Sequence, residues 1–96
     1  MIRVVAKNYV KADKVEAFIL VAKQLVKDTH QYDAGCIRYE LMQSVQNAQV
    51  LTMYEEWEDK ESLDKHMATE HFKVGVGAFE ELVEKPGEIE LYTQLA

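Results

Sequence analysis

The stretch CIRYELMQSVQNAQVLTMYEEW, residues 36–57, decides the fold. Within it, Ile37, Tyr39 and Leu41 alternate with residues of an opposite face, and a second apolar run follows over residues 50–57. Alternation with a period of two is typical of β-strands, and a short polar connection makes two such strands antiparallel neighbours. We therefore expect a β-hairpin whose tip is the polar segment 44–48.

A strand and a helix are predicted before this hairpin. Residues 2–10 alternate in the same way, and Asn8 is the one polar residue on the face that includes Ile2 and Val4. Apolar residues then recur at helical spacing from about residue 13 to residue 30. Asp13 is a suitable N-cap for this helix, because its carboxylate can accept hydrogen bonds from free backbone N–H groups.

Two helices are predicted after the hairpin. Asp59 can cap a short helix that places His66 on its inward face. A break is expected near Thr69, where a new apolar stripe begins. This stripe covers residues 72–83, and the Pro86-Gly87 pair is expected to stop the helix that carries it.

The predicted order is strand, helix, strand, strand, two helices and a last strand over residues 89–95. This is the split βαβ pattern of the ferredoxin-like α+β class, here a single domain over residues 1–96 with helices on one face of an antiparallel sheet. The other face is expected to carry apolar and aromatic groups drawn from Val5, Tyr9, Met53, Trp57 and Tyr92. Monomers rarely expose such a face, so a two-fold homodimer packed through it is the simplest arrangement.

Composition argues against several kinds of partner. The chain has 17 acidic and 11 basic residues and a net charge of −6, with no run of Lys or Arg, which disfavours nucleic acid. No apolar stretch approaches the roughly 20 residues that span a bilayer, and the start of the chain does not resemble a signal peptide. The single cysteine, Cys36, cannot form an internal disulfide and is expected to be a small buried strand residue. These features predict a cytoplasmic protein without membrane or nucleic-acid partners.

Three stretches resemble the antibiotic biosynthesis monooxygenase domains of the dimeric α+β barrel superfamily. They are GCIRYE at residues 35–40, YEEW at residues 54–57 and LDKHMATEHF at residues 63–72. The resemblance covers nearly the whole chain and implies a homodimer with a mostly apolar small-molecule pocket. Family members differ in reaction: some are quinol or anthrone oxygenases without metal or flavin, some are isomerases of phosphorylated autoinducer sugars, and some degrade haem.

One departure from the family bears on this choice. Haem-degrading relatives place an axial His about one helical turn after the position of Phe72, where this chain has Val74, Gly75 and Val76. Haem is therefore not expected. Glu70 stands where many relatives have Pro, which bears on the start of a helix and on no site residue.

The resemblance assigns catalytic roles to three residues. A cofactor-free oxygenase must deprotonate an electron-rich phenol so that the anion can pass an electron to dioxygen. His66 has a suitable ordinary pKa and is the candidate base. Asn8 is the candidate hydrogen-bond donor to the oxyanion, and Trp57 is the candidate flat wall of the pocket.

Four more residues are expected to line the substrate pocket: Tyr39, Glu55, His71 and Phe72. Burial of Glu55 would raise its pKa and make it an acid or base near neutral pH, whereas an ion pair with Arg38 or Arg3 is the competing, purely structural interpretation. Tyr39 has a competing role in core packing.

No metal or other cofactor is expected. His66 and His71 are five residues apart, which on a continuous helix places them about 140° apart, whereas helical metal sites use a spacing of three or four residues. The break near Thr69 leaves open a closer approach of the two rings.

These residues predict a cofactor-independent monooxygenase acting on a small quinol or polyphenol with dioxygen. Two alternatives remain open: a proton-transfer enzyme or isomerase acting on a small keto compound, phosphorylated or not, and a dimeric binder of a hydrophobic metabolite without catalysis.

Overall fold

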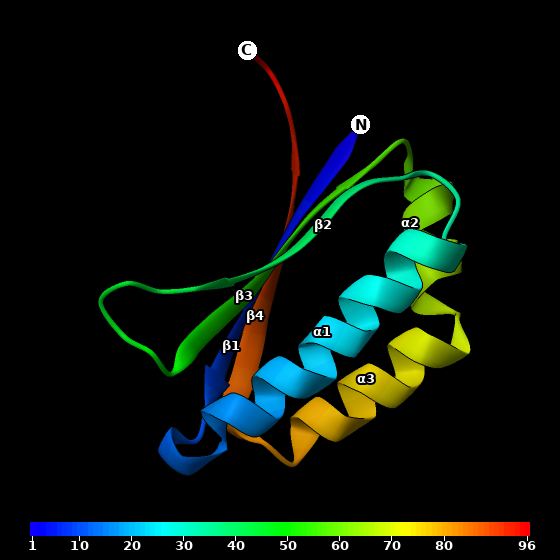
Figure 1. The fold of residues 1–96 in the computed structure, drawn as a ribbon. Helices are drawn as coiled ribbons and strands as arrows, with labels where there is room; N and C mark the ends of the chain where they lie inside the picture. The colour runs from blue at the N-terminus through cyan, green and yellow to red at the C-terminus, as the bar shows by residue number, and fades with distance from the viewer.

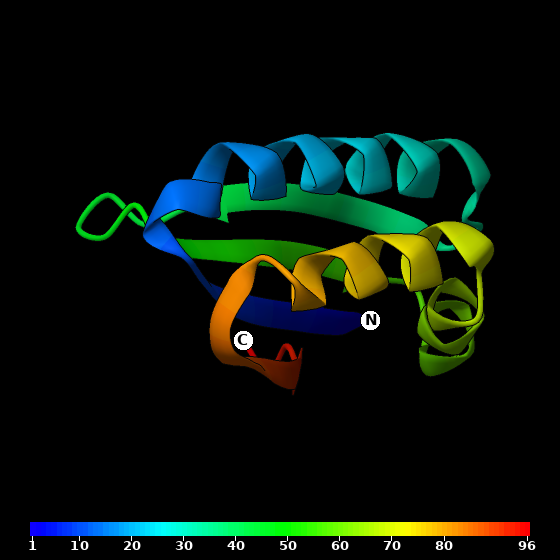
Figure 2. The same ribbon diagram turned by 90° about the horizontal axis from the view of Figure 1, so that it is seen from below.

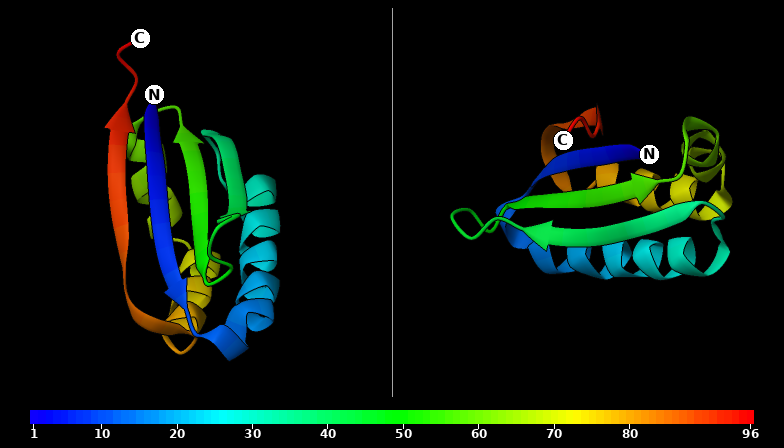
Figure 3. Two further views of the ribbon diagram at one scale, coloured as in Figure 1. Left: turned by 90° about the vertical axis from the view of Figure 1, so that its left-hand side faces the viewer. Right: turned by 90° about the horizontal axis from the view of Figure 1, so that it is seen from above.

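The computed structural model describes residues 1–96 and shows an antiparallel sheet with helices on one of its faces (Figures 1 and 2). The strand order in the sheet is β2-β3-β1-β4, and every neighbouring pair is antiparallel. The left view of Figure 3 looks onto the face that no helix covers. The predicted ferredoxin-like α+β class is thereby confirmed. In chain order the elements are β1 (Ile2–Val10), the 3₁₀ turn η1 (Ala12–Lys14), α1 (Val15–Tyr32), β2 (Cys36–Gln43), β3 (Val50–Trp57), α2 (Lys60–Met67), α3 (Glu70–Glu80) and β4 (Val83–Thr93).

The register of the sheet determines which side chains face the helices. Pairing of Ile2 with Trp57 and of Ala6 with Met53 places these four residues on the covered face, where Trp57 and Met53 are buried. Of the aromatic and apolar groups expected on the uncovered face, only Val5, Tyr9 and Tyr92 lie there. Met53 and Trp57 belong to the core instead, because the same alternation carries them to the opposite side.

The core forms where α1 and α3 pack side by side on the sheet (Figure 2). The rings of Phe18 from α1 and Phe79 from α3 stack with centroids 4.1 Å apart. Gly75 allows the close approach of these helices, since a Cβ at this position would lie 3.2 Å from Leu25 Cδ2. No helix of the fold combines the length and the apolar character that crossing a lipid bilayer requires.

Two of the three expected helix boundaries are confirmed by their capping hydrogen bonds. Asp59 Oδ1 accepts a bond of 2.8 Å from Ser62 N at the start of α2, and Thr69 Oγ1 accepts one of 3.2 Å from Phe72 N at the start of α3. The third, an N-cap at Asp13, is wrong: Asp13 lies inside the 3₁₀ turn, and α1 begins after Lys14 without a side-chain cap.

The Pro86-Gly87 pair does not stop a helix, and this expectation is also wrong. Helix α3 already ends at Glu80, and the pair lies within β4, which starts six residues earlier than the predicted 89. Lys7 pairs with Glu88 and Tyr9 pairs with Lys85, so Pro86 and Gly87 form a bulge opposite the residue between them. Strand β4 is an edge strand, where a proline costs no ladder hydrogen bond on its free side.

A second irregularity moves Ile37 out of the face it was expected to share with Tyr39. Cys36 pairs with Trp57 and Arg38 pairs with Glu56, so Ile37 is an extra residue in β2 and is 49% exposed. Strict alternation cannot reveal such a bulge, because the apolar pattern of the sequence continues through it.

The two glycines of α3 provide a matched test of this packing. A Cβ at the exposed Gly77 would meet no atom within 4 Å, so Gly77→Ala is expected to raise the free energy of unfolding by about 1 kcal/mol through helix propensity alone. Gly75→Ala is expected to raise the free energy of unfolding by less than this, or to lower it, because the new methyl group presses on Leu25. Urea unfolding of both variants checks this, and equal gains would contradict the packing described.

Candidate functional site

An apolar cavity of about 630 Å³ lies between the covered face of the sheet and helices α2 and α3. Side chains of β1, β3 and β4 form one wall, and Leu63, Phe72 and Phe79 from the two helices form another. The volume and the apolar lining suit a small organic molecule. Six charged residues, Lys7, Glu55, Lys60, Glu80, Glu84 and Lys85, also border this space, and Glu55 is the one that is buried.

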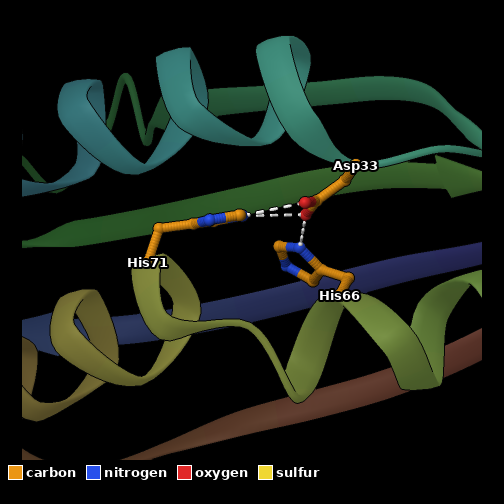
Figure 4. Close-up of side chains that lie close together, drawn as sticks. All are labelled: Asp33, His66 and His71. Atoms are coloured by element: carbon orange, nitrogen blue, oxygen red, sulfur yellow. Dashed lines mark hydrogen bonds and ion pairs between the residues drawn. The ribbon is translucent and has the colours of Figure 1, made fainter.

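Asp33, His66 and His71 form a hydrogen-bonded cluster beside this cavity (Figure 4). Asp33 follows α1 directly, while His66 comes from α2 and His71 from α3. His66 Nδ1 bonds to Asp33 Oδ2, and His71 Nε2 lies 2.9 Å from Asp33 Oδ1 and 3.0 Å from Oδ2. One carboxylate therefore holds both imidazoles.

The break between α2 and α3 is what brings the two histidines together. Thr69 both caps α3 and donates a hydrogen bond of 2.7 Å to the carbonyl of His66, which ends α2 in a tight turn. Without this turn the five-residue spacing would separate the rings by about 140° around one helix. The approach that the break near Thr69 left open is therefore realised.

His66 is the most deeply buried member of the cluster. Its side chain is 0% exposed and packs against the rings of Trp57, Phe72 and Tyr39, with centroids 4.7, 4.9 and 5.0 Å away. Burial lowers the pKa of His66 and outweighs the opposing influence of Asp33, so the imidazole is neutral at pH 7. Because Nδ1 faces a carboxylate, the hydrogen of the neutral ring belongs on Nδ1.

This arrangement leaves His66 Nε2 as an unprotonated nitrogen. It is buried and has no hydrogen-bond partner, while His66 itself forms part of the cavity wall. Buried polar atoms are almost always paired, so an unpaired one beside a cavity is a candidate contact for a ligand. The tautomer set by Asp33 makes Nε2 an acceptor of a proton.

The same three side chains are a donor set that zinc or ferrous iron can use, since their ligand atoms lie within 4.8 Å of one another. Hydrogen bonds among them already satisfy both nitrogens and the carboxylate. The unpaired atom, Nε2, is the one that does not contact the carboxylate. That the site works without metal stays a prediction, which chelation tests.

We expect chelation to leave the protein unchanged. Dialysis against EDTA should not alter thermal unfolding, and added Co²⁺ should not quench the fluorescence of Trp57, the only tryptophan, whose ring lies 4.7 Å from that of His66. Saturable quenching by one equivalent of Co²⁺ that disappears in Asp33→Asn would establish a metal site and contradict this prediction.

Glu55 is a second buried titratable group on the cavity wall. It is 5% exposed, and its Oε1 accepts a hydrogen bond of 2.9 Å from Trp57 Nε1. Burial raises its pKa to about 7. The competing ion pair is wrong: Arg3 and Arg38 lie on the uncovered face and contact the neighbouring Glu56, at 3.1 and 3.8 Å. Adjacent strand residues point to opposite faces, which is why Glu55 has no cationic partner.

Asn8 lines the cavity with its amide already engaged. Asn8 Nδ2 lies 3.3 Å from the carbonyl oxygens of both Ala6 and Leu51. The two amide hydrogens are thus directed at backbone, and a flipped amide would set its oxygen against both carbonyls. The free polar atom of the Asn8 side chain is therefore Oδ1, which lies near Gly87 in the β4 bulge. Oδ1 is an acceptor, so the side chain does not present the expected hydrogen-bond donor.

The remaining predicted site residues divide into two groups. Tyr39 and Phe72 line the cavity, and burial together with the nearby carboxylate of Glu55 raises the pKa of Tyr39, which keeps its hydroxyl protonated. Trp57 and His71 do not line it. Trp57 is fully buried, holds Glu55 and packs on His66, whereas His71 contacts Asp33.

Asp33 is the site residue that sequence reasoning missed. The signal that could have found it is the register of the hairpin. Cys36 pairs with Trp57, so the segment before β2 lies beside the segment after β3, where α2 begins. A carboxylate three residues before β2 is thereby close to a histidine of α2.

Cys36 is half-buried near this cluster, as expected of a structural strand residue. Burial, with smaller contributions from Asp33 and Glu55, raises the pKa of its thiol to about 11. The thiol is therefore protonated at neutral pH and is a poor nucleophile.

The sheet is antiparallel with helices on one face, and between them lies an apolar cavity bordered by a carboxylate-held imidazole. These features define a ferredoxin-like α+β domain with a cavity of small-molecule size. The family model of antibiotic biosynthesis monooxygenases matches residues 1–78. The chain belongs to this family, which confirms the resemblance of its three motifs.

Three individual proteins are similar to this chain. A conserved protein from Methanosarcina mazei Go1 is 42% identical, with a TM-score of 0.93 over 98% of this chain and 92% of that one. YcnE from Bacillus subtilis, named as a candidate monooxygenase, is 31% identical over 80% of each chain. Protein sll1783 from Synechocystis is 32% identical over 93% of this chain, which spans 60% of that protein's length.

Proposed function

We propose that the protein is a cofactor-independent monooxygenase that oxidises a small hydroxylated aromatic compound, such as a quinol or polyphenol, with dioxygen. The observation that carries the proposal is the unpaired Nε2 of His66, a buried proton acceptor whose tautomer is set by Asp33. Membership of the antibiotic biosynthesis monooxygenase family supports the reaction class.

His66 would act as a general base. Nε2 takes the proton of a substrate hydroxyl, and Asp33 stabilises the imidazolium that forms, as a carboxylate does in other His-based sites. The resulting anion is electron-rich enough to reduce dioxygen. One oxygen atom enters the ring and the other leaves as water, so a quinol yields a hydroxyquinone and its own electrons balance the reaction.

The cavity walls serve this step by excluding water. Leu63, Phe72 and Phe79 line one wall of the space with apolar groups, which strengthens electrostatic interactions beside that wall and protects reactive oxygen intermediates. Trp57 supports the walls indirectly, because it packs on His66 and positions Glu55.

The polar atoms at the cavity favour a substrate that carries hydroxyl hydrogens. His66 Nε2 and Asn8 Oδ1 are both acceptors, and Glu55 is an acceptor when ionised. A ligand with two or more hydroxyl groups can donate to them, whereas a ligand with carbonyl groups alone cannot. These acceptors suit a polyphenol, while Lys7, Lys60 and Lys85, which also border the cavity, are donors that a carbonyl group of a keto compound could use.

Dioxygen consumption by the metal-free protein tests the proposal. A panel of reduced naphthoquinols and catechols is supplied, and autoxidation of each is subtracted. Enzyme-dependent uptake with a hydroxyquinone product is the expected result. Uptake that equals autoxidation for every compound, together with turnover of a keto compound or tight binding without turnover, would favour the isomerase or the binder instead.

The uncovered face of the sheet supports the expectation of a homodimer. Val5, Tyr9 and Tyr92 lie on it, and no helix covers this face; the Lys85 side chain lies over the Tyr9 ring, with Nζ 4.2 Å from the ring centroid. Burial of this face in a second copy would stabilise the dimer by about 25 cal/mol for each Å² of apolar area, before the cost of association. Light scattering should give about twice 11.1 kDa at micromolar concentration, and a clean monomer would refute face-to-face pairing.

A further inference from the structure

We propose that Glu55 is a second catalytic residue, which protonates a peroxide formed on the substrate ring and then removes the hydrogen of the carbon that bears the peroxide. The inference rests on the proposed function, which supplies the quinol, the dioxygen and His66 as the base of the first step. It assigns a residue to the half of the reaction that forms water.

This second half needs two proton-transfer groups at once. After His66 has taken a hydroxyl proton, dioxygen adds to the neighbouring ring carbon as a peroxide anion, and that carbon still carries its hydrogen. Formation of a hydroxyquinone then requires a proton on the peroxide, removal of the hydrogen on carbon, and release of hydroxide from the O–O bond. A base for the C–H proton and an acid for the leaving hydroxide act together, and one group cannot be both.

Glu55 and His66 together balance these steps. Protonated Glu55 gives its proton to the peroxide and becomes a carboxylate. The carboxylate then takes the proton of the C–H bond, whose electron pair forms a new C=O bond while the O–O bond breaks. The departing hydroxide takes the proton that His66 holds and leaves as water. Both side chains return to their starting forms, dioxygen is reduced by the ring, and no proton is released overall.

The contacts of Glu55 place it for this role. It borders the cavity and is 5% exposed, and its Oε1 accepts a hydrogen bond of 2.9 Å from Trp57 Nε1. Its other oxygen, Oε2, has no hydrogen-bond partner in the chain and is free to contact a ligand. The same indole packs on the ring of His66, with centroids 4.7 Å apart. One rigid side chain thus contacts both proton-transfer groups.

The other titratable groups of the cavity suit the role less well. Tyr39, Glu55 and His66 are the buried ones. Burial and the Glu55 carboxylate raise the pKa of Tyr39, so its phenol stays protonated and cannot remove a proton from carbon. Burial raises the pKa of Glu55 to about 7, which makes its acid and base forms both available at neutral pH. The remaining groups are exposed at the border: Lys7 of β1, Lys60 of α2, Glu80 of α3, and Glu84 and Lys85 of β4.

The products formed from 1,4-dihydroxynaphthalene test the step, because the peroxide has two fates. If it is dehydrated, the products are a hydroxynaphthoquinone and water; if it is expelled instead, they are 1,4-naphthoquinone and hydrogen peroxide. In Glu55→Gln we expect the hydroxynaphthoquinone share to fall by about tenfold or more while dioxygen uptake continues. Gln still accepts the Trp57 hydrogen bond but can neither give nor take the proton. Chromatography and a peroxide assay measure both products, with autoxidation subtracted.

Glu58→Gln is the matched control, since Glu58 is an exposed carboxylate directly after β3 and outside the cavity lining. It should leave the product ratio unchanged. An unchanged ratio in Glu55→Gln would overturn the proposal. Loss of dioxygen uptake in that variant would also overturn it, because Glu55 would then act before dioxygen adds. Absence of uptake by the wild-type protein would instead refute the proposed function, and this step with it.

The wild-type protein supplies a second readout that needs no substitution. Ionised Glu55 cannot protonate the peroxide, so the hydroxynaphthoquinone share should fall as pH rises through about 7, whereas Glu55→Gln should show a low and constant share. The groups next to Glu55 keep their charge in this range. Its register partners are Val4, which is apolar, and Tyr39, which stays protonated, and burial keeps His66 neutral. A share that does not change with pH in the wild-type protein would overturn the proposal.

Discussion

Replacing His66 with Gln is expected to lower kcat/KM for dioxygen uptake by about 10²–10⁴-fold, the usual contribution of a general base. Gln can keep a hydrogen bond to Asp33 and fills most of the buried space, but it has no basic nitrogen at the position of Nε2. The loss should therefore fall on proton removal and leave the fold intact. An oxygen electrode measures the rate, and thermal unfolding with light scattering confirms the fold and the mass.

Two further variants sharpen this experiment. Asp33→Asn should also reduce the rate, because an amide opposite Nδ1 no longer fixes the hydrogen on that nitrogen. His30→Gln removes an exposed histidine that contacts the carbonyl of Tyr39, and it should retain activity. A packing defect alone would change the rate by about threefold. Activity of His66→Gln within about threefold of wild type would therefore refute a base at this position.

The features of the fold that follow from local patterns were predictable. Alternation identified the strand at residues 2–10 and the hairpin. A side chain able to accept a hydrogen bond marked the start of α2 at Asp59, and the new apolar stripe after Thr69 marked the break before α3. The bulge at Ile37 and the position of Pro86 were not predictable, because both depend on the register between paired strands, which the pattern of one strand does not show. Propensity places Pro86 equally well at a helix end and in an edge strand.

The candidate site was predictable in its residue types and less so in its geometry. Five of the seven expected residues line the cavity: Asn8, Tyr39, Glu55, His66 and Phe72. The direction of the Asn8 amide depends on carbonyl groups of two strands, and the meeting of His66 with His71 depends on the turn at Thr69. Predicting Asp33 as a site residue required the register between β2 and β3, which the pattern of neither strand shows by itself.

The cavity and the cluster together suggest a division of labour between two sides of one imidazole. The apolar wall beside Nε2 weakens the imidazole as a base, and Asp33 offsets this effect by stabilising the charge that forms when Nε2 takes a proton. Burial alone would make His66 too weak a base, as the direction of its pKa shift indicates. The carboxylate is thus the group that reconciles a dry cavity with proton transfer.

The second large effect is expected in the pH dependence of stability, from Glu55→Gln. Burial gives Glu55 a pKa of about 7 in the folded protein, against its ordinary value of 4.5. Between these values the folded protein holds a proton that the unfolded chain has released, so the free energy of unfolding falls as pH rises. The loss is complete above the folded pKa and amounts to about 3 kcal/mol. Gln cannot ionise and can still accept the hydrogen bond of Trp57.

Urea unfolding at several pH values measures this difference directly. The stability of Glu55→Gln relative to wild type should increase by about 3 kcal/mol between about pH 4.5 and pH 8. The lowered pKa of His66 acts in the opposite direction, because the unfolded chain then binds the extra proton, but it acts in both proteins and cancels in the difference. Glu58→Gln, at an exposed position beside the same strand, should show no such trend. A constant difference between Glu55→Gln and wild type would mean that Glu55 ionises as freely in the cavity as in water, and would remove it as a pH-sensitive group of the site.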